Sequence, residues 1–272
     1  MKPQTLSIIV TTYNRPDALG LVLHALEAQT QRDFEVIIAD DGSNEETNEL
    51  IKELHPHLSY DLTHLWQQDK GFRAARARNK AVLASKGDYI IFLDGDSVPQ
   101  KDFVKNHRKL AEKNWFIAGN RVLLQQTLTE KIVYKGLPIW QWSKWHWFLH
   151  YINRDMNRFL PLFRLPFGRY LRKMNATRWQ GAKTCNLGLW REDITKINGF
   201  DEAYEGWGHE DADFVVRLIR NGIKRKEGRF SVPVFHLWHQ IEDRQSEAEN
   251  KTRLETILQS KETIAKKGLN AE

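Results

Sequence analysis

The stretch at residues 89–97, YIIFLDGDS, constrains the fold more than any other part of the chain. Its five consecutive apolar residues predict a strand that is buried on both faces of a parallel sheet. The run ends in Asp94-Gly95-Asp96, so two carboxylates follow the strand at the edge where open α/β sheets bind ligands. Gly95 adds no bulk between them and allows backbone to approach a ligand closely.

Two neighbouring carboxylates repel each other, and a bound divalent cation relieves that repulsion. Hard oxygen ligands suit Mg²⁺ or Mn²⁺, which proteins usually share with the phosphates of a substrate. The tripeptide therefore indicates a site for a metal and a diphosphate. A solvated turn after a strand is the alternative, because Asp-Gly is a common turn dipeptide.

Apolar runs alternate with helix-like segments along the first hundred residues. Strands are expected at residues 6–12, 34–39, 62–66 and 89–93, and helices at 16–29, 45–54 and 72–84. This order predicts a mostly parallel sheet with helices on both faces. Right-handed crossovers place the carboxyl ends of all the strands on one edge. One cleft is expected there, lined by the polar residues that follow the strands: Thr12-Tyr13, Asp40-Asp41, Asp69-Lys70 and Asp94–Asp96.

The expected cleft lacks the familiar phosphate loops. Neither GxGxxG after the first strand nor GxxxxGK[ST] occurs, which disfavours dinucleotide-binding and P-loop proteins. Instead GFRAARARN, at residues 71–79, opens a helix at the edge of the cleft. A helix start with arginines can bind an anion. A solvated basic face is the alternative, and three arginines in six residues cannot all share one face.

The composition is that of a soluble globular protein, with 41% apolar and 28% charged residues among 272. A single cysteine, Cys185, rules out an intramolecular disulfide and fits a reducing compartment. No signal peptide is apparent, because the first five residues lead straight into a strand-like run. No apolar stretch is long enough to span a bilayer. A cytoplasmic location is therefore expected.

The positive charge is concentrated in one segment. Residues 131–191 contain twelve Lys or Arg and one acidic residue, Asp155, whereas the rest of the chain has 29 basic and 34 acidic residues. Such a segment attracts anionic lipid, nucleic acid or a phosphorylated acceptor.

The same segment is rich in tryptophan. A period near 3.5 relates Trp142, Trp145, Leu149, Ile152, Met156, Phe159 and Phe163. Together with Lys144, Arg154 and Arg158 they predict a basic amphipathic helix, broken by Pro161 and Pro166. Such a helix is typical of an interfacial membrane element. The alternative, an aromatic stripe packed on the sheet, is the commoner arrangement.

Acidic residues gather again at the start of a predicted helix near residue 210. Glu210, Asp211 and Asp213 lie in or just before its first turn, where the helix dipole favours carboxylates. Two glycines and Trp207 precede them, a flexible lead-in that a simple helix cap does not need.

Two histidines end the last strand-like run, at residues 232–239. In an extended chain His236 and His239 would point to opposite faces, and a turn at residues 237–238 would bring both inward. They are candidates for metal ligands or for structural histidines. Residues 241–272 are charged and predict a C-terminal helical arm.

Taken in order, these motifs resemble family 2 glycosyltransferases with the GT-A fold. The resemblance runs over residues 6–239 and rests on SIIVTTYNRP, IIADDGS, ARNKA, DYIIFLDGDSVP and NGFDEAYEGWGHEDADFVVRL, followed by HLWH. The GWG-x-ED element is similar to that of β-1,4-galactosyltransferases, polypeptide N-acetylgalactosaminyltransferases and bacterial chondroitin polymerases.

An α/β GT-A fold, Rossmann-like and nucleotide-sugar-binding, is thus expected, with a mostly parallel sheet flanked by helices. We expect a nucleotide-sugar-binding half at residues 1–125 and a basic Trp-rich helical insertion at 126–178. The acceptor-binding and catalytic half is expected at 179–240, and the helical arm at 241–272.

The resemblance implies a donor site built largely from the amino-terminal half. Asp41 would contact the nucleobase, Arg78 would face the diphosphate, and Asp94 would touch the ribose or the donor sugar. Further donor-binding residues implied by the resemblance are Thr12, Tyr13, Arg15, Lys70, Gly95, Asp96, Trp207 and Gly208.

The resemblance also implies the catalytic and metal-binding roles. Asp96 would bind Mn²⁺ or Mg²⁺, with His239 and His236 as further ligands. Asp211 would be the catalytic base, and Glu210 would bind the sugars. An inverting transfer needs a carboxylate that deprotonates the acceptor hydroxyl, and cations that stabilise the departing diphosphate. Asp211 and the metal-bound Asp96 should then flank the anomeric carbon from opposite sides.

The chain departs from the family pattern in two places. It has His209 where relatives often have glycine, and two extra residues between Gly71 and the Arg-Asn pair. Both departures affect the identity of the donor rather than the reaction type.

The expected function is a metal-dependent inverting glycosyltransferase that uses a nucleotide sugar, expected to be a UDP-sugar. The expected acceptor is a glycan or a lipid-linked, lipopolysaccharide-type saccharide, with the enzyme peripheral on the inner face of a bacterial inner membrane. A nucleotidylyltransferase is disfavoured, because YNRP offers no glycine-rich triphosphate loop. The remaining alternative is a basic nucleic-acid- or membrane-binding module with a degenerate nucleotide site. The complete set of carboxylates argues against it, and no nucleic-acid partner is expected.

Overall fold

The computed structural model describes residues 2–164, 168, 170–240 and 244–270. Its centre is a seven-stranded sheet in the order β3-β2-β1-β4-β8-β6-β9. The strands are β1 (Leu6–Thr12), β2 (Glu35–Asp40), β3 (Asp61–Trp66), β4 (Tyr89–Asp94), β6 (Trp115–Ala118), β8 (Asn186–Trp190) and β9 (Lys224–Glu227). Strands β1 to β4 are parallel to one another, and β8 runs antiparallel to both β4 and β6. The mostly parallel sheet is confirmed, with the carboxyl ends of β1 to β4 on one edge.

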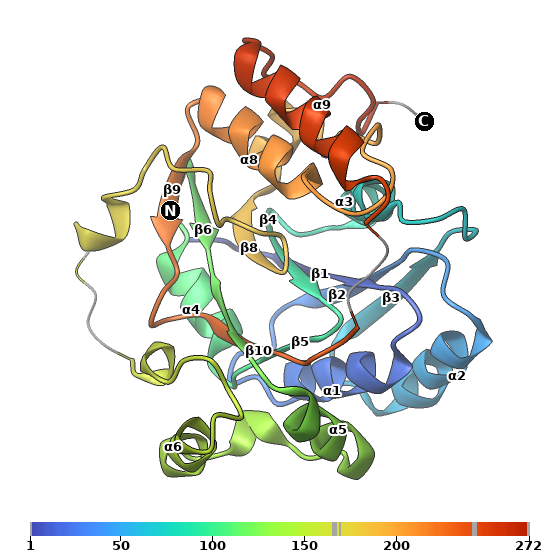
Figure 1. Ribbon diagram of the computed structural model, residues 1–272, viewed down its shortest axis with the longest axis vertical. Coiled ribbons are helices and arrows are strands. Elements are labelled where there is room, and N and C mark those ends of the chain that lie inside the picture. Colours follow the sequence, from blue (N-terminus) through green and yellow to red (C-terminus); the bar gives the residue numbers. More distant parts are fainter. Residues whose placement is uncertain (1, 165–167, 169, 241–243, 271–272) are drawn as a thin grey trace.

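The central strands are buried on both faces because helices cover both faces (Figure 1). In β1, Ile8 and Val10 pack into one core, and Ile9 packs into the other. On the first face lie α1 (Pro16–Glu27), α2 (Glu45–Leu54) and α4 (Phe103–Leu110). On the second lie α3 (Ala74–Ala84), α7 (Arg191–Lys196) and α8 (Glu210–Arg220). The continuous apolar runs in the sequence arise from these two cores.

Several element bounds agree closely with the expectations. β1 and α2 have the expected bounds, and β2 and β3 shift by one residue. Helix α3 begins two residues later than expected, at Ala74, and the turn His55–His57 follows α2. The proposed divisions at residues 125, 178 and 240 stay predictions.

A second, smaller sheet is not expected from the sequence as a separate sheet, although the last strand-like run of the sequence belongs to it. It has the order β5-β10-β7, formed by β5 (Ser97–Pro99), β10 (Pro233–His236) and β7 (Asn120–Leu123). His236 lies opposite Ser97 in the antiparallel pair, and the Leu237 amide donates to the Asp96 carbonyl at 2.9 Å. The expected strand at 232–239 therefore ends at His236, and residues 237–240 continue as irregular chain beside Asp96, without the turn expected at 237–238.

The tryptophan-rich segment is helical only in part. It contains α5 (Gln126–Lys135), α6 (Lys144–Ile152) and three single turns, at Ile139–Gln141, Leu160–Leu162 and Leu171–Lys173. The prediction of one amphipathic helix reaching Phe163 is wrong. The helix ends earlier because Arg154 adopts a left-handed φ of 60° and Met156 pairs with Leu124 in an isolated bridge. Pro161 lies in a later turn, and Pro166 lies outside the described residues.

The aromatic and aliphatic stripe is divided between the core and the surface. Trp147 and Met156 are buried, whereas Trp145, Leu149 and Ile152 are exposed. The prediction that the stripe packs on the sheet holds for its inner members only.

The C-terminal arm is also only partly helical. Helix α9 (Glu247–Gln259) packs against α8, and the described chain after it is irregular. That chain returns to the second core, where the amides of Ala265 and Leu269 donate to the carbonyls of Ile197 and Asn198. Residues 241–243 and 271–272 of the expected arm lie outside the described residues. Within the described ranges, no helix has both the length and the apolar character that a membrane span requires.

Candidate active site

A pocket of about 410 Å³ opens at the carboxyl edge of the sheet. Its walls come from both halves of the chain: Tyr13, Asp41, Lys70, Gly71, Phe72, Glu205, Gly206, Trp207, Gln245 and Ser246. Four predicted donor-site residues, Tyr13, Asp41, Lys70 and Trp207, are thus together. A second, shallower hollow of about 440 Å³ lies between α1 and the segment 136–141, and none of the predicted site residues lines it.

The floor of this pocket is organised around Asp41. Its carboxylate accepts hydrogen bonds from the Gln67 side chain and from the Arg73 amide, each at 2.6 Å. Burial raises the pKa of Asp41, and these hydrogen bonds oppose the rise. Beside it, the Tyr13 hydroxyl donates to Asp69 at 2.9 Å. Asp41 is therefore a rigid polar group at the base of a partly aromatic pocket.

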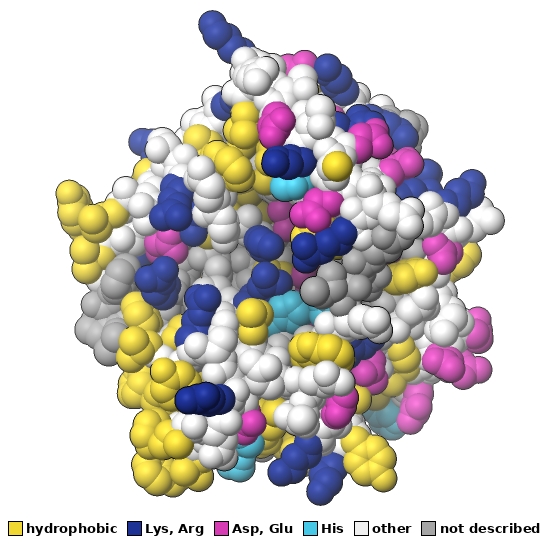
Figure 2. Space-filling model, viewed as in Figure 1, with side chains coloured by type: hydrophobic (Ala, Val, Ile, Leu, Met, Phe, Trp, Pro, Cys, Tyr) yellow, Lys and Arg dark blue, Asp and Glu magenta, His cyan; other side chains and the backbone are white. Residues whose placement is uncertain are grey.

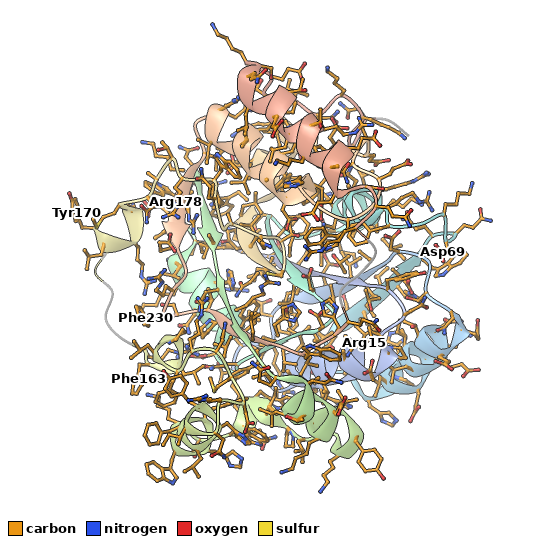
Figure 3. All side chains as sticks on the ribbon, in the orientation of Figure 1. Arg15, Asp69, Phe163, Tyr170, Arg178 and Phe230 are labelled. Atoms are coloured by element: carbon orange, nitrogen blue, oxygen red, sulfur yellow. The ribbon has the colours of Figure 1, made fainter. Side chains whose placement is uncertain are left out.

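Three other predicted donor-site residues lie at or beside this edge without lining the pocket. Arg15 forms an ion pair with Asp17 at 2.9 Å, at the start of α1 (Figure 3). Thr12 is buried, and a side chain at Gly95 would come within 3.1 Å of its hydroxyl. Gly95 thus makes room for β1. That Gly95 also allows backbone to approach a ligand stays a prediction.

A cluster of carboxylates surrounds the buried guanidinium of Arg78. Its nitrogens lie 3.1 Å from Glu210, 3.6 Å from Asp94 and 3.7 Å from Asp211. Burial alone would lower the pKa of Arg78, but the three carboxylates outweigh it and raise the pKa further. The predicted diphosphate, sugar and catalytic residues therefore meet at one point, although they come from α3, β4 and α8.

Two of these carboxyl groups hold protons more tightly than usual. Burial raises the pKa of Asp94 to about 7, Arg78 opposes the rise, and the charges of Asp96 and Asp211 add to it. Burial and the charge of Asp211 also raise the pKa of Glu210. Perturbed carboxyl groups in a cleft are typical of sites that bind cations or perform acid–base chemistry.

Asp211 is held in one orientation. Its two oxygens accept hydrogen bonds from Thr184, from the hydroxyl at 2.5 Å and from the amide at 3.2 Å. Just before it, His209 has a left-handed φ of 72°, a conformation that glycine adopts without strain. His209 therefore keeps a glycine-like backbone at the start of α8.

Asp96 lies beside the two predicted histidine ligands. The donor atoms of Asp96, His236 and His239 are all within 4.8 Å of one another, the only such group of three or more among the described residues. The Nδ1 atoms of the two histidines lie 2.8 and 2.7 Å from the carbonyls of Leu237 and Gln240. The Nε2 atom of His239 lies 3.4 Å from Asp96, whereas the nitrogen of His236 nearest Asp96 is its Nδ1, at 3.6 Å. The irregular segment after β10 thus carries both imidazoles to one carboxylate, and this donor set fits a divalent cation.

The two acidic pairs, Asp94/Asp96 and Glu210/Asp211, interact through their charges. Asp94 and Arg121 are each within electrostatic reach of both Asp96 and Asp211. Histidine and basic side chains gather at the centre of the face drawn in Figure 2, with acidic side chains beside them. Gly208 precedes this cluster with a φ of 107°, and Arg244 lies 4.4 Å above the Trp207 ring.

Sequence reasoning missed Arg121 and Thr184. Arg121 is half-buried on β7 and lies opposite Val234, hence on the same face of the small sheet as His236. Burial would lower the pKa of Arg121, but Cys185 and the cluster carboxylates raise it. No local signal marks either residue, because Arg121 occurs in an ordinary strand and Thr184 in a run of small residues.

Sequence comparison finds two family models in the chain. The model described as "Glycosyl transferase family 2" matches residues 7–176. A second, described as "N-terminal domain of galactosyltransferase", matches residues 170–241. The junction between the two matches lies in the basic segment, between the two groups of carboxylates.

Among curated proteins, similarity is moderate and covers most of the chain. Hyaluronan synthase of Pasteurella multocida is 31% identical over 238 residues, 80% of this chain and 23% of that protein. Chondroitin synthase of Escherichia coli is 28% identical over 80% of this chain and 32% of its own length. Validoxylamine A glucosyltransferase of Streptomyces hygroscopicus is 28% identical over 83% of this chain and 54% of its own length. The chain thus spans between about a quarter and about half of these relatives.

Solved structures share the fold. A mannosyltransferase from Pyrobaculum calidifontis, in complex with GDP-Man and Mn²⁺, has a TM-score of 0.58 and 18% identity, covering 92% of this chain and 60% of that chain. S. aureus TarS in complex with UDP has a TM-score of 0.60 and 14% identity, and the match covers 94% of this chain and 65% of that chain. The expected GT-A fold is confirmed.

Proposed function

Because the chain belongs to glycosyl transferase family 2, we propose that it is a metal-dependent, inverting glycosyltransferase that uses a UDP-sugar. The proposed acceptor is a glycan or a lipid-linked, lipopolysaccharide-type saccharide at the inner face of a bacterial inner membrane. The observation that carries the reaction type is the meeting of Asp94, Glu210 and Asp211 around Arg78, next to Asp96 and its two histidines.

The pocket around Asp41 is the proposed nucleotide site. Its hydrogen-bonded carboxylate would meet the nucleobase, with Tyr13 and Lys70 beside it. From there the diphosphate would extend towards Arg78 and Asp94. A uridine donor is supported by the UDP complex of one structural neighbour, while the GDP-Man complex of another makes GDP-sugars the necessary comparison.

Asp96, His236 and His239 are the proposed metal ligands. A divalent cation held there would neutralise the charge that develops on the departing diphosphate. Two imidazoles beside one carboxylate favour Mn²⁺ over Mg²⁺, which prefers oxygen ligands. Arg121, on the same face of the small sheet, adds a fixed positive charge near the leaving group.

Asp211 is the proposed base. Thr184 fixes its carboxylate, so one orientation towards an acceptor hydroxyl is prepared before the acceptor binds. Asp211 would take the hydroxyl proton as the acceptor oxygen attacks the anomeric carbon. Glu210, held by Arg78, would accept hydrogen bonds from sugar hydroxyls.

The decisive experiment separates binding from turnover. With Mn²⁺ present, a UDP-sugar should raise the melting temperature, because a ligand that binds only the folded protein stabilises it. Slow release of UDP from that donor to water then reports chemistry without a known acceptor. Asp211→Asn should lower the release rate at least about 100-fold and leave the thermal shift intact.

Asp61→Asn is the matched control, because Asp61 is exposed at the start of β3, away from the carboxyl edge. It should leave both readouts unchanged. Undiminished release in Asp211→Asn would remove that residue from the base role. If only GDP-sugars stabilise the protein, the donor is a GDP-sugar and not the proposed UDP-sugar. If no nucleotide sugar stabilises it, the proposal is overturned.

A further inference from the structure

Helix α6 carries an uncovered apolar face. Trp145, Leu149 and Ile152 are 67%, 46% and 58% exposed. Phe148 lies among them, with its ring centre 5.4 Å from that of Trp145. The four residues occupy positions i, i+3, i+4 and i+7, so they share one side of the helix. Apolar residues in this pattern normally face a core, yet three of these four are exposed, and the fourth, Phe148, is half-buried against Phe159.

The opposite side of α6 is firmly packed. Trp147 is 3% exposed and stacks on Phe235 of β10, with ring centres 4.0 Å apart and planes at 15°. Trp142 contacts Trp147 at 4.9 Å, and the Ser143 hydroxyl caps the helix by accepting from the His146 amide. The helix is thus fixed in one rotation about its axis. The outward position of Trp145 and its neighbours follows from that packing.

The segment that carries the exposed face also carries many basic side chains. Five exposed lysines and arginines belong to the same segment: Lys131, Lys135, Lys144, Arg154 and Arg158. The acidic residues among the described positions 126–164 are Glu130 and Asp155, and Asp155 pairs with His150 at 2.7 Å. Lys144 also lies 5.3 Å from the ring centre of Phe163, which Figure 3 places beside α6. Figure 2 shows hydrophobic and basic side chains mixed over this part of the surface.

From this combination we propose that the α6 face, formed by Trp145, Phe148, Leu149 and Ile152, docks into the interface of an anionic lipid bilayer. Its apolar side chains would enter the boundary between headgroups and acyl chains, and the lysines and arginines of the same segment would bind anionic headgroups. Nucleic acid is a poorer match, because Leu149 and Ile152 offer no ring on which bases can stack.

Docking in this way orients the active site. Phe235, on which Trp147 stacks, immediately precedes the proposed metal ligand His236 on β10. The helix that meets lipid and the strand that holds the metal are therefore in direct contact. This places the cleft close to the bilayer, where the saccharide of a lipid-linked acceptor would be presented. That last step rests on the proposed function, whereas the docking itself does not.

Vesicle flotation with the full chain tests the proposal. Wild type should float with vesicles of phosphatidylcholine and phosphatidylglycerol, weakly with phosphatidylcholine alone, and less as salt increases. Trp145→Ser/Leu149→Ser should lower partitioning into the anionic vesicles at least about tenfold. The control is Leu83→Ser, because Leu83 is 47% exposed on α3, against 46% for Leu149. It should float like wild type.

Charge reversal tests these basic residues separately. Lys144→Glu/Arg154→Glu should lower partitioning by a similar factor, whereas Lys86→Glu, an exposed lysine beyond α3, should have little effect. Each variant should keep the wild-type melting temperature, since none of these side chains is buried. Equal flotation of the serine double variant and wild type would overturn the proposal, as would binding that is indifferent to lipid charge.

The UDP-sugar thermal shift distinguishes this inference from the proposed function. A serine double variant that loses flotation but keeps the shift supports docking by α6. A wild type that floats but shows no shift with any nucleotide sugar refutes the donor and leaves the docking intact. A wild type that stays with the soluble fraction at low salt while binding the donor refutes the docking alone.

Discussion

The guanidinium of Arg78 lies 3.1 Å from the carboxylate of Glu210, although 132 positions separate them in the sequence. Both side chains are buried, at 5% and 7% exposure. Arg78 comes from α3 in the amino-terminal half, and Glu210 is the first residue of α8. This pair, together with Asp94 and Asp211, joins the region that would hold the donor to the region that would receive the acceptor.

Removing the charge of Arg78 should destabilise the fold as well as the site. Arg78→Met leaves three carboxylates without their shared cation, and an uncompensated buried charge costs about 3–5 kcal/mol of unfolding free energy. Arg78→Lys keeps the positive charge but not the planar guanidinium, so it should lose less unfolding free energy than Arg78→Met. Urea unfolding measures the unfolding free energy of both variants, provided that their m-values match that of wild type. A methionine variant as stable as wild type would show that solvent, rather than Arg78, compensates these acids.

The metal site makes a separate prediction. Asp96→Asn and His239→Gln should each weaken Mn²⁺ binding at least about tenfold, because each removes one of few protein ligands. Melting temperatures without metal should stay close to wild type, since both side chains lie at the cleft surface. A Mn²⁺ titration followed by thermal shift gives the affinities, with His57→Gln, an exposed histidine after α2, as the control. Unchanged Mn²⁺ affinity in both variants would exclude the Asp96 site.

Thr184 should act through Asp211 rather than on substrate. Thr184→Val removes the 2.5 Å hydrogen bond while keeping the shape of the side chain. It should lower the rate of UDP release about tenfold or more, with little change in the KM for the donor. Thr184→Ser keeps the hydroxyl and should restore most of the rate. If valine and serine variants behave alike, the hydroxyl is not what orients the carboxylate.

The parts of the fold that sequence reasoning predicted well depend on local patterns. The apolar run at β4 and the acidic pair after it are visible in nine consecutive residues, and the parallel order follows from the alternation of elements. Arg121 reaches the site only because β7 pairs with β10, more than a hundred residues away. The helix expected to reach Phe163 ends early because Met156 pairs with Leu124, a contact that periodicity cannot show. The features that the sequence pattern misses are thus those that depend on pairing between segments far apart in the chain.

Stability should fall on mild acidification because of His107. This imidazole is fully buried between α4 and β8, where its Nε2 lies 3.2 Å from the Asn186 side chain. Burial lowers the pKa of His107 from 6.5 to about 3, although the contact with Asn186 opposes the shift. The folded protein therefore keeps this histidine neutral at a pH where the unfolded chain already binds a proton.

The sign of the effect follows from that difference. The contribution of His107 to the unfolding free energy is complete above pH 6.5 and decreases as the pH falls from 6.5 towards 3, by up to about 1.4 kcal/mol per pH unit. His107→Gln cannot titrate, so its unfolding free energy should depend less steeply on pH in this window. Subtracting the two urea-unfolding profiles cancels the other ionisable groups. Parallel profiles between pH 6.5 and 4 would mean that the folded protein accepts the proton on His107.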